Sequence, residues 1–201
     1  MQQRSIETRN TILAAALTCF SRSGYDAASV AEICAEAGVS KGAFYHHFAT
    51  KHAVFMAILE EWLTRLDSQV TTYVESATDV SQALVSMAGM MGGIFSEAGG
   101  RLNMFLEFWA HSSRDPQVWQ TVIAPYHHFE ELFAGIIQRG VAEGTLQTDD
   151  PEATASAVLA LGIGILLQGL LDPKSTAWDK VAVESMQTLV KGLSSTVSHN
   201  K

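Results

Sequence analysis

The spacing of the apolar residues constrains the fold of this chain more than any other feature of its sequence. Apolar residues recur at steps of three and four, and no stretch shows a sustained alternation of apolar and polar residues. The first pattern is typical of amphipathic helices and the second of strands, so the sequence predicts an all-α protein of about nine helices. Because 47% of the 201 residues are hydrophobic and 17% are charged, these helices can bury a substantial core.

Capping and turn residues place the expected helices along the chain. The first is expected from about residue 6 to residue 21, with Gly24 after it. Ser29, Ser40 and Thr50 are the expected N-caps of the next three, and Gly38 supplies the turn between the second and the third. Five further helices are expected at residues 79–98, 101–112, 115–141, 150–171 and 178–197.

The charge of the chain is distributed unevenly. The net charge of −8 argues against a nucleic-acid partner, since DNA-binding surfaces are usually basic. Residues 1–52 nevertheless hold five basic and four acidic residues, whereas the rest of the chain holds eight basic and seventeen acidic ones. This asymmetry is compatible with a small DNA-facing head on an acidic body, although it does not require one.

The cysteines and the apolar stretches indicate the compartment. Cys19 and Cys34 are too few for a disulfide scaffold and suit a reducing environment. The longest apolar stretch, residues 157–171, has 15 residues, fewer than the about 20 that a transmembrane helix needs. No secretion signal is recognisable at the N-terminus. We therefore expect a cytoplasmic protein without a membrane partner.

Residues 29–48 describe two short helices joined by a glycine turn, which is a helix-turn-helix pattern. The second of these helices presents Ser40, Lys41 and Gly42 at its start, with Tyr45 and His46 one turn later. Small residues at its start allow such a helix to enter the major groove of DNA, which is about 12 Å wide. The pattern alone leaves open a plain helical hairpin inside a larger bundle.

The amino-acid sequence of this region resembles that of the tetracycline-repressor (TetR) family of transcriptional regulators. The resemblance covers residues 5–55 and rests on SGYDAASV at 23–30, AGVSKGAFYHHF at 37–48 and TKHAVF at 50–55. A weaker similarity to BetI-type members of the family follows in FWAHSSRDP at 108–116, GVAEG at 140–144, DPEA at 150–153 and LLQGLLDP at 166–173. The resemblance implies an all-α homodimer that binds a palindromic operator and releases it when a small molecule enters the C-terminal domain.

The resemblance also implies a division of labour along the chain. Residues 1–52 would form the helix-turn-helix DNA-binding domain, and residues 53–201 the effector-binding and dimerisation domain. In the first domain Ser29 would touch a phosphate, and Lys51 would bind another together with the helix N-terminus that Thr50 caps. The residues carried over as DNA contacts are Ser29, Ser40, Lys41, Gly42, Tyr45, His46 and Lys51.

Two features of the C-terminal part suggest a dimer interface and an effector site. Gly162, Gly164 and Gly169 weaken a helix unless close packing compensates, so we expect the last two helices to pair with those of a second copy. An ordinary intramolecular core is the alternative. Methionine, aromatic and polar residues form the expected pocket for a hydrophobic or amphipathic effector: Trp62, Met87, Met91, Phe95, Phe105, Trp109, Tyr126 and Gln168. The same stripes are equally consistent with a simple core.

Other chemistry is not indicated by the sequence. The neighbouring histidines lack further ligands at metal spacing, and no phosphate loop, nucleophile elbow or catalytic carboxylate pair is recognisable, so we expect no cofactor and no enzyme. The resemblance implies a ligand-responsive transcriptional regulator, which we expect to act as a repressor. The alternatives are an activator of the same kind and a helical carrier or enzyme whose N-terminal head is structural.

Overall fold

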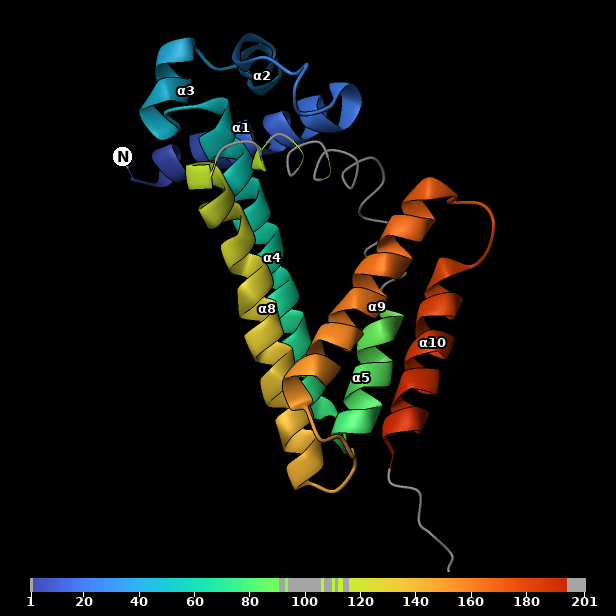
Figure 1. The fold of residues 1–201 in the computed structure, drawn as a ribbon. Helices are drawn as coiled ribbons and strands as arrows, with labels where there is room; N and C mark the ends of the chain where they lie inside the picture. Colours follow the sequence, from blue (N-terminus) through green and yellow to red (C-terminus); the bar gives the residue numbers. More distant parts are fainter. Residues whose placement is uncertain are drawn as a thin grey trace, which may run out of the picture. The chain divides into compact units, whose positions relative to one another are not determined.

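The computed structural model describes residues 2–90, 93, 106, 110, 112–113 and 116–194 (Figure 1). Every regular element in these residues is an α-helix, which confirms the predicted fold class. The helices are α1 (Gln2–Ser23), α2 (Val30–Ala37), α3 (Lys41–His47), α4 (Lys51–Ser76), α5 (Val80–Gly89), α8 (Pro116–Ala142), α9 (Pro151–Leu171) and α10 (Trp178–Leu193). The helix expected over residues 101–112 falls almost entirely outside the described residues, as do most of residues 91–98 and the last residues of the final helix.

Four helix starts and two turns lie where the capping and turn residues predict them, whereas α5 ends at Gly89 and not at residue 98 as expected. Ser29, Ser40, Asp79 and Asp150 each accept a hydrogen bond from a backbone N–H in the first turn of the helix that follows. Gly24 and Gly38 have φ values of 83° and 65°, a left-handed conformation that other residues rarely adopt. Local sequence chemistry therefore determines where these helices begin and end.

The chain forms two compact units, which we describe separately. The first comprises residues 1–66 and 98–119, and the second comprises residues 67–97 and 120–201. In the first unit the large side chains Phe20, Phe44 and Phe55 are fully buried. Since Phe55 belongs to α4 and its ring lies 5.9 Å from that of Phe20, the first half of α4 is part of this core. The unit therefore extends past residue 52, where the sequence suggested a boundary.

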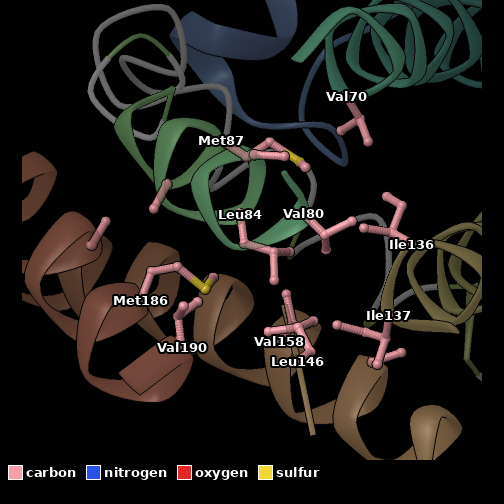
Figure 2. Close-up of a cluster of buried hydrophobic side chains, with 14 of the residues drawn as sticks. Val70, Val80, Leu84, Met87, Ile136, Ile137, Leu146, Val158, Met186 and Val190 are labelled. Atoms are coloured by element: carbon pink, nitrogen blue, oxygen red, sulfur yellow. The ribbon is translucent and has the colours of Figure 1, made fainter. Parts of the chain in front are cut away.

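The core of the second unit is built from parts of five helices and one connecting segment (Figure 2). Its buried side chains come from the end of α4, from α5, α8, α9 and α10, and from the segment between α8 and α9. The labelled members are Val70, Val80, Leu84, Met87, Ile136, Ile137, Leu146, Val158, Met186 and Val190. In α5 and α10 these residues recur at three- and four-residue steps, as the sequence predicts for core-facing stripes.

Helix α9 is apolar on the outside as well as on the inside. Ile163 and Leu167 are each 42% exposed, and Leu171 is 77% exposed. Among the described residues this is the one helix long and apolar enough to cross a bilayer by length and composition, a criterion that core helices of soluble proteins also meet. Such an exposed apolar face is unusual for a monomer and is typical of a surface that another molecule covers.

Candidate nucleic-acid interface

The N-terminus of α2 is closed by a reciprocal pair of hydrogen bonds. The Glu32 backbone N–H donates to Ser29 Oγ at 3.2 Å, and the Ser29 backbone N–H donates to Glu32 Oε2 at 2.8 Å. The Ser29 hydroxyl donates to the same carboxylate oxygen at 2.9 Å. The hydrogen bond from the Ser29 backbone N–H lowers the pKa of the Glu32 carboxyl most, and the hydrogen bond from the Ser29 hydroxyl lowers it further. The expected contact of Ser29 with a phosphate stays a prediction, and it requires this hydroxyl to exchange one acceptor for another.

Helix α3 has one buried face and one exposed face. Phe44 is fully buried, and Phe48, which follows the last helical residue, is 6% exposed. At the start of the helix the Ala43 backbone N–H donates to Ser40 Oγ at 3.1 Å. The exposed residues of the helix are those predicted to meet DNA: Lys41, Gly42, Tyr45 and His46. Because positions four residues apart share a helix face, the fold brings these four side chains to one surface, hereafter the α3 face.

The α3 face combines a cation, an open backbone and an aromatic ring. Lys41 forms no ion pair with any described residue. A β-carbon on Gly42 would meet only Ser40 Oγ, at 3.7 Å, so space does not require glycine there in the free protein. The Tyr45 side chain is 54% exposed, although its ring contacts that of Phe44 edge-on at 5.3 Å. This is a surface that can donate hydrogen bonds and stack against another molecule.

The ammonium of Lys51 forms hydrogen bonds within the chain. It donates to three backbone carbonyls, those of Tyr25 at 2.7 Å, Asp26 at 3.1 Å and Ala28 at 2.9 Å. The nitrogen also lies 4.5 Å from the centre of the Tyr25 ring. An ammonium has three hydrogens, and all three are used here. The phosphate contact expected of Lys51 stays a prediction; without DNA its ammonium is bound to three carbonyls of the first unit.

Two of the remaining cations in the head are also engaged. Arg9 pairs with Glu61 at 3.0 Å and lies 5.4 Å from the centre of the Phe48 ring. Arg22 pairs with Glu36 at 3.5 Å. Of the basic residues before position 52, only Lys41 and Arg4 form neither an ion pair nor a side-chain hydrogen bond within the described part of the chain.

Arg4 was not among the DNA contacts expected from the sequence. It is exposed on the first turn of α1, five residues before Arg9. Five residues correspond to about 7.5 Å along a helix and about 140° around it, so the two arginines lie on different faces of α1.

Comparison with known proteins assigns this arrangement. Residues 12–58 match the family model described as bacterial regulatory proteins of the tetR family. Residues 96–194 match the model described as the C-terminal part of BetI-type transcriptional repressors. The chain belongs to the TetR family of transcriptional regulators. The first match contains the whole α3 face, and the resemblance drawn from the sequence is thereby confirmed.

Relatives of this TetR-family chain cover most of its length. It is 26% identical over 194 residues to the HTH-type transcriptional regulator UidR of Escherichia coli, covering 96% of each protein. It is 29% identical over 173 residues to BetI of Vibrio atlanticus, covering 84% of this chain and 83% of that one. These relatives are transcriptional regulators rather than enzymes.

A solved structure shares the fold of this TetR-family chain. It is a putative transcriptional regulator from Saccharomonospora viridis in complex with choline, with a TM-score of 0.81 and 19% identity. The match covers 94% of this chain and 99% of the other. At this identity the likeness concerns the fold, which agrees with the helical order described above.

The predicted effector residues of this TetR-family chain are not gathered by the described structure. Met87 is buried in the core of the second unit, whereas Tyr126 and Gln168 are exposed, so these three do not share an enclosed cavity within it. Trp62 is partly buried and belongs to the first unit. The other four, Met91, Phe95, Phe105 and Trp109, lie outside the described residues. The effector site stays a prediction.

Several titratable groups outside the α3 face are paired. His127 Nδ1 lies 3.0 Å from Glu130 Oε2, and His128 Nε2 lies 2.8 Å from Asp67 Oδ1. A hydrogen bond to Glu130 raises the pKa of the Tyr126 hydroxyl. Within the described ranges no three His, Cys, Asp or Glu side chains are grouped closely enough to hold a metal ion.

Proposed function

We propose that this TetR-family regulator is a cytoplasmic repressor that binds a palindromic operator as a homodimer and is released by a small effector molecule. The observation that carries the proposal is the α3 face. Its four residues project from a helix that Phe44 and Phe48 anchor in the core, inside the segment that matches the TetR-family model. A rigidly held helix with an exposed polar and aromatic face is suited to reading the major groove.

In this proposal the residues of the α3 face have distinct tasks. Gly42 has no side chain, so the helix backbone can approach the base edges at this position. Lys41 and Tyr45 donate hydrogen bonds to bases or phosphates. Arg4 contacts a phosphate from the start of α1, since it carries a charge without an internal partner. With only two unpaired cations in each head, a single head binds weakly, and the operator requires two heads acting together.

The proposed dimer forms through α9 and α10 of two copies. Ile163, Leu167 and Leu171 leave an apolar face exposed on α9. A β-carbon on Gly162 or Gly164 would meet no atom of the described residues within 4 Å, so no packing in this part of the chain compensates for their low helix propensity. The same face on a second copy would cover the apolar side chains and approach closely over the glycines, which is the self-complementary contact of a two-fold dimer.

The proposed effector is a small hydrophobic or amphipathic molecule. The methionines and aromatic residues predicted for the pocket form an adaptable apolar lining, and Tyr126 and Gln168 supply polar groups. The choline complex of the Saccharomonospora viridis protein is an example of this fold with a small molecule bound.

The decisive experiment selects DNA with the full-length protein from a random duplex library and sequences the enriched fragments. We expect a palindromic motif whose half-sites lie about one helical turn apart or a multiple of it. The double variant Lys41→Ala/Tyr45→Ala should enrich no motif while keeping its helical circular dichroism, because both side chains are exposed. Lys174→Ala, which removes an exposed lysine from the segment between α9 and α10, serves as the charge-matched control.

Either result of the selection is informative. A motif that overlaps a promoter should block transcription in vitro with the purified protein, as the repressor proposal requires. Retention of DNA without a motif, disappearing as salt is raised, would mean that the protein binds only phosphates and would overturn the proposal.

A further inference from the structure

The ammonium of Lys51 is held in an unusual way for a charged group. Its partners are three neutral carbonyls and the face of an aromatic ring, with no carboxylate among its hydrogen bonds. The carbonyls belong to Tyr25, Asp26 and Ala28, in the segment between α1 and α2. Burial lowers the pKa of the ammonium, and the nearby charge of Asp26 opposes this effect. A cation placed at the centre of three carbonyl dipoles fixes the segment that carries them.

We propose that Lys51 is a positioning residue for DNA binding: it fastens the segment 25–28, and through it α2 and α3, to the first turn of α4. This inference rests on the proposed function, since it concerns how the α3 face is held. Ser29, the cap of α2, follows directly after the last of the three carbonyl residues. The position of α2 therefore depends on the segment that Lys51 holds, and α3 follows α2 through the Gly38 turn.

The aromatic core reinforces this connection on the other side of the segment. Tyr25 is 5% exposed, and its ring contacts those of Phe20 at 5.4 Å and Phe55 at 5.2 Å. Phe55 is four residues after Lys51, so the same turn of α4 holds both the ring and the carbonyl of Tyr25. The aromatic rings hold the segment by packing. The ammonium also fixes the orientation of the segment, because each hydrogen bond sets the direction of one peptide group.

The connection also gives the α3 face a route for regulation. Helix α4 continues without interruption from Lys51 to Ser76, a residue of the second unit. A displacement of the first turn of α4 is passed to the segment 25–28 by three hydrogen bonds and reaches the cap of α2. Loss of the ammonium should therefore uncouple the orientation of α3 from α4 without removing a contact to DNA.

Salt dependence separates this role from a phosphate contact. Each phosphate contact contributes about 0.9 to the slope of log K against log salt concentration, or about 1.8 for a dimer. The test compares Lys51→Met, Lys51→Arg and the control Lys41→Met on the duplex enriched by the wild-type protein. Methionine keeps an unbranched stem without the charge. Arginine keeps the charge, but its planar fork does not fit three convergent carbonyls.

Both Lys51 variants should lose operator affinity by about ten-fold or more, with the wild-type salt slope, after correction for the folded fraction. Lys41→Met should reduce the slope. Full affinity of Lys51→Arg together with a reduced slope for Lys51→Met would show that Lys51 contacts phosphate and would overturn the proposal. Unchanged affinity of folded Lys51→Met would overturn it as well, since the ammonium would then serve stability alone.

A measurement without DNA distinguishes failure of this inference from failure of the proposed function. Hydrogen exchange of the free protein should show faster exchange at the amides of residues 25–30 in Lys51→Met, with the interior amides of α1 unchanged. Equal exchange in wild-type and variant protein would overturn the inference even if an operator is found. Faster exchange at these amides, without any duplex enriched in the selection, would support the inference about Lys51 and contradict the operator binding of the proposed function.

Discussion

Gly140 of α8 packs so closely against Leu146 that a β-carbon on the glycine would lie 2.6 Å from Leu146 Cδ1. The same β-carbon would lie 3.0 Å from Val80 Cγ1 at the start of α5. The backbone N–H groups of Thr145 and Leu146 both donate to the Gly140 carbonyl, at 3.0 and 3.1 Å. The segment after α8 thus folds back over the glycine and inserts Leu146 into the core of the second unit. Close packing, rather than an unusual φ angle, requires glycine at this position.

Gly140→Ala should destabilise the protein by about 1–3 kcal/mol, because the added methyl group forces Leu146 and the start of α5 apart. The expected sign is opposite to that of helix propensity. Gly135 of the same helix is the matched control, since a β-carbon there meets nothing within 4 Å. Gly135→Ala should stabilise by about 0.5–1 kcal/mol. Urea unfolding of both variants measures the difference, and equal effects of the two substitutions would contradict the packing argument.

The capping box of α2 should make stability depend on pH. The pKa of Glu32 is lower in the folded protein than its ordinary value of 4.5, so the unfolded chain binds the proton more readily. The stabilising contribution is therefore present above about pH 4.5 and disappears as the pH falls through the folded pKa. Glu32→Gln should be less stable than wild type at pH 7 and should converge with it at low pH.

Urea unfolding between pH 3 and pH 7 checks this dependence. The control is Glu75→Gln, since Glu75 is an exposed residue of α4 that forms no ion pair with any described residue. A parallel pH dependence in wild type and Glu32→Gln would show that the cap does not contribute.

The helix ends and the α3 face could be predicted from the sequence because their determinants are local. The side chains of Ser29 and Ser40 reach N–H groups three residues away, and the left-handed turn at Gly38 needs only the absence of a β-carbon. Phe44 is buried and Tyr45 exposed as the helical period requires. Such contacts extend over one or two helical turns, so they can be inferred from the residue types at neighbouring positions.

The hydrogen bonds of Lys51 could not be predicted in the same way. Its acceptors are backbone carbonyls more than twenty residues earlier, and every residue offers a carbonyl. Only the packing of the segment 25–28 against α4 selects three of them. The pairing of Arg9 with Glu61 has the same origin, since the partners are 52 positions apart. Long-range packing therefore decides which cations of the head are left for DNA.

The effector pocket marks another limit of sequence reasoning. Met87 satisfies the description of an adaptable pocket residue and of a core residue equally well, and the described structure places it in the core. An apolar stripe indicates that a helix face is covered, but it does not indicate whether a ligand or another helix covers it.

Gly42→Ala should affect stability and DNA affinity in opposite directions. A β-carbon at this position meets only Ser40 Oγ at 3.7 Å, so alanine should raise the free energy of unfolding by up to about 1 kcal/mol. If the helix backbone approaches base edges at Gly42, the same methyl group should weaken operator binding by about ten-fold or more, since about 1.4 kcal/mol suffices. Urea unfolding and fluorescence anisotropy on the selected duplex measure the two effects. Gly135→Ala should raise stability without changing affinity, and wild-type affinity of Gly42→Ala would place the DNA elsewhere.

Ile163→Lys/Leu167→Lys should convert the protein into a monomer. Both side chains are 42% exposed in the single chain, so lysine is tolerated there unless a second copy covers them. In the proposed dimer the substitutions would bury charges of the same sign against one another and against apolar side chains, which costs several kcal/mol. Analytical ultracentrifugation should show half the wild-type mass, with unchanged helical circular dichroism. Operator affinity should fall together with dimerisation, because a single head carries only two unpaired cations. Val141→Lys, at an exposed apolar position of α8, controls for the loss of surface hydrophobicity, and it should remain dimeric. A double variant of α9 with the wild-type mass would exclude this helix from the interface.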